Sequence, residues 1–446
     1  MLRAMQDGTV RRTVVLSAIT AVVTLVAFVA RLALIREAGL DGLHAYDDGV
    51  YYAGATALVS GRMPYQDFLF LHPPGILLAL APFAGLGRLT SDATGLAGAR
   101  VAFLVLGSVN TALVTRVASR YGLIPAALGG LFYALWFPAR YAERIPLLEA
   151  PGNTALLIAL LLLGRTRAKE SPRAQVLAGA ALGFSVCVKI WMVVPLAVIV
   201  LWQLVSGGRQ AALRTAAGAV VGGVLVIAPF LRAGDDMFRM VILDQLNRSP
   251  AQITLAERVT SIFGLTPLAE RAPAVVSGAA VVWTAVVIAL AALAALRQPA
   301  GKLYVALLVS TLAVLIASPS MFEHYGAYAA VPVALVLAAA AAAAMSAGAA
   351  RRGTGAKGLA GRRLALGAVA AAVTPLLLLN SVLLAVDTGR PFPREGLRPD
   401  VADGPCVVSD DPTVLALLDV LGRDLQRGCP VLVDVTGLTY DACAMT

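Results

Sequence analysis

The sequence predicts an all-α polytopic membrane protein, and composition, hydropathy and charge distribution each indicate it. Of the 446 residues, 59% are hydrophobic and 14% are charged, and the mean hydropathy is +0.80. Soluble domains average about 25% charged residues. The formal net charge is +10, but the basic residues lie in short loops between apolar runs. That arrangement indicates membrane topology and excludes nucleic acid as the expected partner.

Eleven apolar runs are candidate transmembrane helices, since about 20 apolar residues cross a bilayer. Several runs are short, which predicts tilted or paired helices around 151–206. The first run has no small-residue cleavage site and is expected to be retained as a span. The predicted spans are 13–35, 97–115, 123–138, 151–164, 174–188, 191–206, 214–232, 273–296, 303–318, 325–348 and 364–386.

The charges predict the orientation of these spans. Lys and Arg gather in the N-terminal segment and in every second loop, whereas most Asp and Glu residues lie in the other loops. The positive-inside rule then places the N-terminus in the cytoplasm and the C-terminus outside. We expect a transmembrane domain over 1–386, with large outer loops at 36–96 and 233–272, followed by a small extracytoplasmic domain over 387–446. The Ala- and Arg-rich composition suggests the inner membrane of a bacterium with a GC-rich genome.

The first outer loop is predicted to contain two interfacial helices. Residues 48–60 have helical apolar spacing and end before Gly61, a residue type common just after helices. Residues 75–87 are apolar but too short to span. Both are expected to lie on the outer leaflet.

The tail is predicted to form a small α/β cap. It has strand-like segments, CVVS and PVLVDV, on either side of a helical segment, 412–422. Cys406 and Cys429 both lie outside in this topology, where a disulfide between them is expected. Cys443 would be left over, although the pairing is not fixed by sequence.

Asp47 and Asp48, beside Tyr51, are the leading catalytic candidates because ionised groups near lipid are costly and tend to be functional. One carboxylate can accept the proton of an acceptor hydroxyl as that hydroxyl attacks. The other can hold the acceptor or a divalent cation such as Mg²⁺ or Mn²⁺, with His44 as a further candidate ligand. The alternative is that these residues cap a helix N-terminus.

The segment 61–75, GRMPYQDFLFLHPPG, contains a rigid Pro-Pro turn. His72 is a candidate contact for a phosphate or an acceptor, and Tyr65 and Asp67 are candidates for a sugar pocket. The alternative for His72 is a solvent-facing residue in a structural turn.

Charged residues at other outer helix ends are also candidates. Glu149 opens a predicted span, and a buried charge there needs a partner such as Arg140, Arg144 or a substrate. Lys189 lies between two apolar segments on the outer side, where a cation suits a lipid phosphate. The alternatives are a local salt bridge for Glu149 and snorkelling of Lys189 to the interface.

Two later segments complete the set of candidates. Glu323, His324 and Tyr325 crowd the outer end of a predicted helix, and no spacing in the chain matches a zinc motif. The loop 233–272 contains Arg248 and is expected to act as a mobile cover over the cleft.

The order of these motifs resembles the GT-C superfamily of membrane glycosyltransferases, most closely the branch of protein O-mannosyltransferases and the lipid A aminoarabinose transferase. The motifs are YDDGVYYAGATALVSG, PYQDFLFLHPPG, LLEAPGN and HYGAYAAVP. The resemblance covers residues 40–155 and, more weakly, 320–332.

The resemblance implies a sugar transferred with inversion from a polyprenyl-phosphate donor to a hydroxyl of a cell-envelope glycan, lipid or protein. Asp47 corresponds to the catalytic base, and Glu149 to a second acid of the outer loops. His72 stands where some relatives have Lys, so that Lys189, Arg140 or Arg248 would hold the phosphate. The alternatives are a transporter or flippase of lipid-linked glycans, which would favour charges at the bilayer midplane, and a non-catalytic subunit of an envelope complex.

Overall fold

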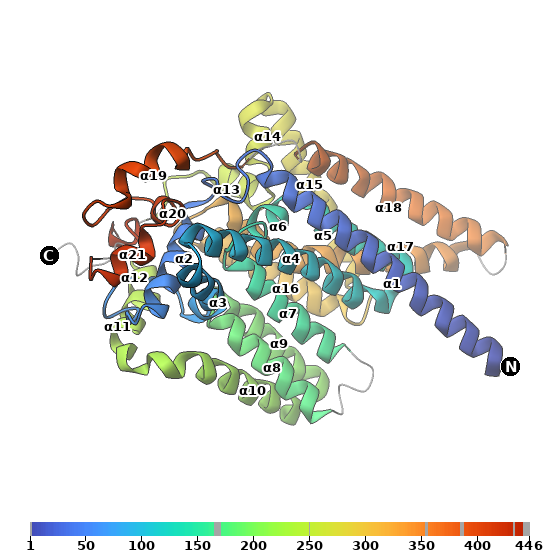
Figure 1. Cartoon of the computed structure of the whole chain (residues 1–446). Helices are drawn as coiled ribbons and strands as arrows, with labels where there is room; N and C mark the ends of the chain where they lie inside the picture. Colours follow the sequence, from blue (N-terminus) through green and yellow to red (C-terminus); the bar gives the residue numbers. More distant parts are fainter. Residues whose placement is uncertain are drawn as a thin grey trace.

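The computed structural model describes residues 2–164, 171–248, 250–352, 356–383, 388–430 and 433–439, and within them it is a bundle of long helices with shorter helices at one end (Figure 1). The long helices are α1 (Leu2–Leu32), α4 (Asp92–Ala118), α5 (Leu123–Leu135), α7 (Glu149–Leu163), α8 (Pro172–Val186), α9 (Val193–Gly207), α10 (Arg209–Ile227), α15 (Ala274–Ala295), α16 (Gly301–Ala317), α17 (Ala330–Arg352) and α18 (Ala356–Val382). Each predicted span coincides with one of them.

The shorter elements connect these helices or follow them. They are α2 (Tyr46–Val59), α3 (Gly75–Leu89), α6 (Phe137–Ala142), α11 (Gly234–Phe238), α12 (Asp244–Leu246), α13 (Leu255–Ile262), α14 (Thr266–Arg271), α19 (Arg394–Ala402), α20 (Pro412–Leu417) and α21 (Leu421–Gln426). Two 3₁₀ turns, η4 (Ile190–Met192) and η7 (Glu323–Ala329), matter for the site described below. The helices of the loop 233–272 are ordered in the structure, and the loop's motion stays a prediction.

The helical, multi-pass character of the fold is confirmed. Among the described residues, six helical segments are long and apolar enough to cross a membrane, and five further apolar helices are shorter. In lipid, a helix satisfies every backbone group within itself, which explains why hydropathy predicts these elements well. The number of crossings and the N-in orientation stay predictions.

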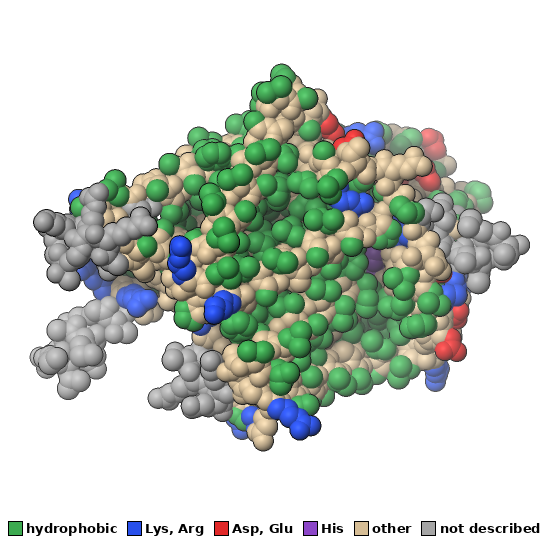
Figure 2. All heavy atoms as spheres, turned by 180° about the vertical axis from the view of Figure 1, so that it is seen from behind, with side chains coloured by type: hydrophobic (Ala, Val, Ile, Leu, Met, Phe, Trp, Pro, Cys, Tyr) green, Lys and Arg blue, Asp and Glu red, His purple; other side chains and the backbone are tan. Residues whose placement is uncertain are grey.

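The surface separates by chemistry along the long axis of the bundle. Figure 2 shows hydrophobic side chains over the middle of the molecule, with acidic side chains at the end that carries the shorter helices. Lys and Arg side chains lie toward both ends in this view, so that only the acidic side chains are confined to one end. This separation agrees with the alternation of basic and acidic loops in the sequence.

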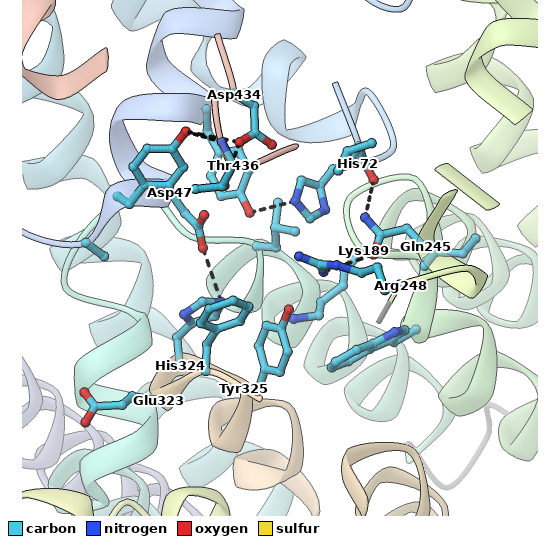
Figure 3. A pocket seen from close by; sticks show the side chains of 18 of the residues that line it. Asp47, His72, Lys189, Gln245, Arg248, Glu323, His324, Tyr325, Asp434 and Thr436 are labelled. Carbon is cyan, nitrogen blue, oxygen red and sulfur yellow. Dashed lines mark hydrogen bonds and ion pairs between the residues drawn. The ribbon is translucent and has the colours of Figure 1, made fainter. Parts of the chain in front are cut away.

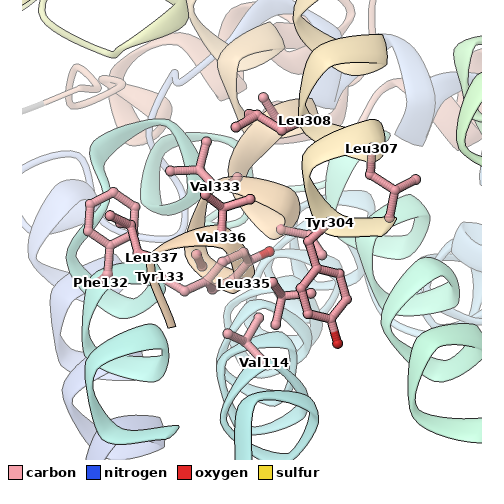
Figure 4. Close-up of a cluster of buried hydrophobic side chains, with 14 of the residues drawn as sticks. Val114, Phe132, Tyr133, Tyr304, Leu307, Leu308, Val333, Leu335, Val336 and Leu337 are labelled. Carbon is pink, nitrogen blue, oxygen red and sulfur yellow. The ribbon is translucent and has the colours of Figure 1, made fainter. Parts of the chain in front are cut away.

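Helix α17 is the central helix of the bundle. In the segment Glu323–Gly348, 78% of the most apolar window is buried inside the protein, against 22% for the first span. Figure 4 shows Val333, Val336 and Leu337 of this helix packed with Phe132 of α5 and Leu308 of α16, all buried. The alanine run on α17 has no long side chains, so neighbouring helices approach closely, as is common in membrane bundles.

Helices α8 and α10 each have two glycines at the contact between them, with three residues between the two glycines. These are Gly179 and Gly183 on α8, and Gly218 and Gly222 on α10. A Cβ atom added at Gly183 would lie 2.0 Å from the Ala219 oxygen, and one added at Gly218 would lie 2.1 Å from the Val176 oxygen. Both distances are far below contact distance, so side chains at these positions would push the helices apart. This close packing fixes α8, whose C-terminal end leads into Lys189.

The predicted helices of the first outer loop form, and α2 is buried over most of its length. Every residue from Asp48 to Ala57 is buried. Helix α2 packs against α3, α20 and α21. Its apolar residues are therefore covered by protein, and the placement of α2 at the membrane interface stays a prediction.

The C-terminal segment is helical where a helix was predicted, but its predicted strands are absent from the described residues. Residues 406–409 have no regular structure, and neither do the described residues of 430–435; residues 431 and 432 and Cys443 lie outside the described part. Cys406 and Cys429 form a disulfide. The backbone of α21 is tied to α4, because Gly422 N donates to Asp92 Oδ2 over 2.8 Å.

A buried polar network inside the bundle positions η7. Arg31 Nη2 bonds Glu143 Oε2 over 2.6 Å, and neither side chain is exposed. Glu143 Oε1 also accepts from the Tyr133 hydroxyl at 2.6 Å. Asn153 donates to the same oxygen at 3.3 Å and to the Ala327 oxygen of η7 at 3.1 Å. Because a buried charge is stable only when it is paired and hydrogen-bonded, this network holds η7 in one arrangement.

Candidate active site

A cavity of about 470 Å³ opens at the end of the bundle where the acidic residues gather. The segments that line it are distant in sequence, and they include the start of α2, the turn at His72, the segment at Lys189, the loop at Arg248, η7 and the C-terminal segment at Asp434 (Figure 3). Most of the predicted site residues therefore come together, although they were identified in separate motifs.

The two adjacent aspartates face different surroundings. Asp48 is fully buried, and its Oδ2 accepts from Arg100 Nε at 2.9 Å and from Nη2 at 2.7 Å. Arg100 also donates to the oxygen of Gly42 at 2.9 Å. Consecutive residues on a helix point about 100° apart, so Asp47 turns toward the cavity. Asp48 does not line the cavity and acts in the structure as an anchor of α2.

Asp47, unlike Asp48, lines the cavity wall. Its side chain is 30% exposed, and its Oδ2 lies 3.5 Å from Nε2 of His324. Burial first, and then the charges of Asp434 and Glu149, raise the pKa of Asp47 to about 7, while Lys189 acts in the opposite direction. A carboxylate with this pKa holds a proton much more readily than an ordinary one, which suits a general base at neutral pH.

The opposite side of the cavity carries positive charge. Lys189 Nζ lies 2.5 Å from Glu149 Oε1, and the two side chains are 7% and 1% exposed. The same ammonium lies 4.5 Å from the centre of the Trp191 ring and 4.4 Å from that of Tyr325. Arg248 also lines the cavity (Figure 3).

Gln245 joins Arg248 to the turn at His72 through two hydrogen bonds. Its Nη1 donates to Gln245 Oε1 at 3.2 Å. Gln245 in turn donates to the Leu71 oxygen at 3.0 Å. The loop 233–272 is thereby joined to the turn that carries His72.

His72 faces the cavity as an uncharged ring. Its Nε2 lies 3.3 Å from the Tyr51 hydroxyl, and its backbone oxygen accepts from Tyr65 at 2.7 Å. Burial first, and then the charges of Lys189 and Arg248, lower the pKa of His72 to about 3. A neutral imidazole offers a hydrogen bond but no charge to a phosphate.

Three predicted pocket residues line the cavity from η7. Glu323, His324 and Tyr325 all line it, and in Figure 3 His324 and Tyr325 point into it whereas the Glu323 carboxylate points away. His324 packs edge-on against Tyr325, with 4.7 Å between ring centres. Tyr51, from α2, lines it as well. The Pro-bearing segment after Tyr325 continues directly into the central helix, so this wall is rigidly held.

Other candidates do not line the cavity. Arg140 is fully buried, and it donates to the oxygen of Leu135 at 2.9 Å and to that of Asn380 at 2.8 Å. Arg144 is also buried, stacked 3.9 Å from the Tyr141 ring centre. These two guanidinium groups contact backbone oxygens and an aromatic ring. Of the predicted phosphate-binding cations, only Lys189 and Arg248 line the cavity.

Glu149, Tyr65 and Asp67 lie outside the cavity lining too. Glu149 stands behind Lys189 as its partner. The Tyr65 side chain is buried and holds the backbone of His72. Asp67 is exposed and accepts from the Met63 amide at 2.6 Å. Each one shapes the local chain and does not face the cavity.

The candidate metal ligands do not converge. Asp48 is bound to Arg100, and the His44 ring lies 2.8 Å from the Gly39 oxygen, in a separate pocket. Among the described residues, no group of three or more His, Cys, Asp or Glu side chains is arranged to hold a metal ion. Asp47, Asp48 and His44 therefore do not form a metal site together, and a divalent cation stays a prediction.

Sequence reasoning missed the contribution of the C-terminal segment. Asp434 and Thr436 line the cavity beside Tyr46, whose hydroxyl donates to Asp434 Oδ1 at 3.2 Å. The single acid within the apolar run PVLVDV is a signal that could have drawn attention to Asp434. Gln245 and Trp191 were also missed, because amide and indole groups in outer loops have no distinctive pattern.

With this geometry in view, the chain resembles solved membrane transferases. It is similar to the crystal structure of ArnT from Cupriavidus metallidurans bound to undecaprenyl phosphate, with a TM-score of 0.58 and 17% identity over 96% of this chain and 88% of that one. The chain therefore has the same fold as this ArnT structure. The fold that the motifs implied is thereby confirmed.

A second group of neighbours has the same fold in a longer chain. The archaeal oligosaccharyltransferase AglB from Archaeoglobus fulgidus, in complex with an inhibitory peptide and a dolichol-phosphate, matches with a TM-score of 0.57 and 13% identity over 87% of this chain and 58% of that one. Another AglB structure is a complex with zinc and sulfate. No protein-family model matches the chain, and no curated protein matches it in sequence.

Proposed function

We propose that this protein is an inverting glycosyltransferase that moves a sugar from a polyprenyl-phosphate donor to a hydroxyl of a cell-envelope acceptor. The observation that carries the proposal is the cavity itself, with Asp47 on one side and Lys189 and Arg248 on the other. ArnT bound to undecaprenyl phosphate and AglB bound to a dolichol-phosphate share the fold, which supports a lipid-linked donor.

The chemistry follows from this separation of charge. The acceptor oxygen attacks the anomeric carbon and passes its proton to the Asp47 carboxylate. The bond from that carbon to the phosphate oxygen breaks on the opposite face, and polyprenyl phosphate leaves with the electron pair. Lys189 and Arg248 stabilise the negative charge of the departing phosphate. One carboxylate suffices, because inversion needs no covalent sugar intermediate.

We further place the cavity on the extracytoplasmic face of a bacterial inner membrane. The acidic loops, which the positive-inside rule assigns to the outside, are those that build the cavity. Whether the sugar is a hexose or a pentose is a question for the assay.

The test is an in vitro transfer assay with purified protein in lipid nanodiscs and a panel of radiolabelled polyprenyl-phosphate sugars. Asp47→Asn is expected to lower transfer by about 10²–10⁴-fold, which is the contribution of a general base, with donor binding retained. Asp41→Asn makes the same change at an exposed residue of the same loop and is the matched control. Full transfer by Asp47→Asn would remove the base assignment.

The same assay separates the alternatives. A transporter or flippase of lipid-linked glycans, or a non-catalytic subunit, would bind the donor and return it unchanged. Absence of labelled product with every donor, together with movement of labelled donor across vesicles, would replace the transferase proposal.

A further inference from the structure

The cavity has an acidic side as well as a basic side, and the acidic side depends on the C-terminal segment. Asp47 comes from α2, and Asp434 comes from the chain after the disulfide. The Tyr46 hydroxyl, one residue from Asp47, donates to Asp434. In Figure 3 Asp47 and Asp434 lie across the cavity from Lys189 and Arg248.

Three hydrogen bonds fix the position of the Asp434 carboxylate. Its Oδ1 takes hydrogen bonds from the Tyr46 hydroxyl at 3.2 Å, from Thr436 Oγ1 at 3.0 Å and from the Gly437 amide at 2.8 Å. Its Oδ2 takes no hydrogen bond from the described residues, although the residue is only 8% exposed. Asp434 lines the cavity, so this oxygen can accept a hydrogen bond from a donor group that enters there.

The charges orient the two substrates of the proposed reaction. The donor phosphate is attracted to Lys189 and Arg248 and repelled by the two carboxylates. The attacking alcohol must reach Asp47, so it occupies the acidic side. Asp434 then lies beside the acceptor and away from the leaving phosphate.

We propose that Asp434 is an acceptor-binding, specificity-determining residue, and that the acceptor is a neutral or cationic polyol whose attacking hydroxyl has a neighbouring hydroxyl or amine and no phosphate close by. This rests on the proposed function and narrows it. Oδ2 of Asp434 accepts from the neighbouring donor group while Asp47 faces the attacking hydroxyl. A phosphate next to that hydroxyl meets two carboxylates and is excluded.

The test compares matched acceptors on the full-length protein in nanodiscs. One acceptor is a neutral alkyl glycoside, and the other is the same glycoside with a phosphate on the carbon next to the attacking hydroxyl. With wild type, transfer to the neutral glycoside is expected to exceed transfer to the phosphorylated one at least tenfold, because like charges in a cavity cost binding. Equal or better use of the phosphorylated acceptor would overturn the proposal.

The variant Asp434→Asn tests the residue itself. Asn keeps an oxygen for Tyr46 and Gly437 but removes the charge. The acceptor KM is expected to rise about tenfold or more, the contribution of a hydrogen bond to a charged group. The donor KM stays within about twofold of the wild-type value, and discrimination against the phosphorylated acceptor is reduced. A raised donor KM with an unchanged acceptor KM would contradict the assignment.

Two further variants separate binding from folding. Asp410→Asn makes the same change at an exposed position of the C-terminal segment and serves as the control. Tyr46→Phe removes one bond to Oδ1 and keeps the charge, so it is expected to retain discrimination against the phosphorylated acceptor. Loss of that discrimination in Tyr46→Phe would show that the segment acts only through its structure.

A binding measurement that needs no sugar transfer tests the Asp434 proposal separately from the proposed function. Each glycoside is titrated by microscale thermophoresis into protein saturated with polyprenyl phosphate. If no sugar is transferred from any donor, the transferase proposal fails. The Asp434 proposal still stands when the neutral glycoside binds wild type at least tenfold more tightly than Asp434→Asn. It fails when the two proteins bind that glycoside equally.

Discussion

Replacing each of the adjacent aspartates by asparagine should separate catalysis from stability. Asp48→Asn leaves the Arg100 guanidinium buried without its counter-charge. The pair is fully buried, with hydrogen bonds of 2.9 and 2.7 Å, and removal of one partner from such a pair costs about 3–5 kcal/mol. The bond from Arg100 to the Gly42 oxygen remains, so the lower part of this range is expected.

The same substitution at position 47 should have little effect on folding. The Asp47 side chain is 30% exposed, and its Oδ2 lies 3.5 Å from Nε2 of His324. Exposed ion pairs contribute about 0–1 kcal/mol, so the free energy of unfolding of Asp47→Asn should stay close to that of wild type while transfer is lost.

The measurement is the free energy of unfolding by denaturant titration in mixed micelles, followed by tryptophan fluorescence. Replacing the whole pair, as in Asp48→Leu with Arg100→Met, should recover much of the loss, because it leaves no unpaired charge. The reasoning is refuted if Asp48→Asn unfolds like wild type, or if Asp47→Asn is destabilised to the same extent as Asp48→Asn.

Three other predictions follow from the site and the C-terminal segment. Because the pKa of Asp47 is raised to about 7 and the base acts when deprotonated, kcat/KM should rise with pH, with a midpoint near 7, and level off above it; a flat profile from pH 5 to 9 would contradict this. Lys189→Met should weaken polyprenyl-phosphate binding about 10–100-fold, and adding Glu149→Gln should restore thermal stability but not donor binding, as measured by fluorescence titration. Replacing Cys406 and Cys429 by Ser opens a loop with a sequence separation of 23 and should destabilise the C-terminal segment by about 3 kcal/mol, seen as faster hydrogen exchange there; unchanged exchange would argue against it.

Much of the fold could be predicted from sequence because bilayers impose local rules. Each span needs a run of apolar residues that satisfies its own backbone, and this holds whatever the neighbouring helices are. The turn containing His72 and the helix starting at Tyr46 follow from Pro and from apolar spacing in the same way. The protein that covers α2 could not be predicted, because apolar spacing indicates that a face is buried but not whether lipid or protein covers it.

The sequence by itself determined the helices, their apolar character and the position of Asp47 at the start of a helix in an acidic loop. Only the tertiary structure decided which of two neighbouring aspartates faces the cavity, because that depends on the ion pair of Asp48 with Arg100, 52 residues away. It also brought Asp434 to Tyr46 across 388 residues. Helix formation depends on neighbours within a few residues, whereas a charged cavity depends on which distant side chains neutralise one another, and no local pattern records that pairing.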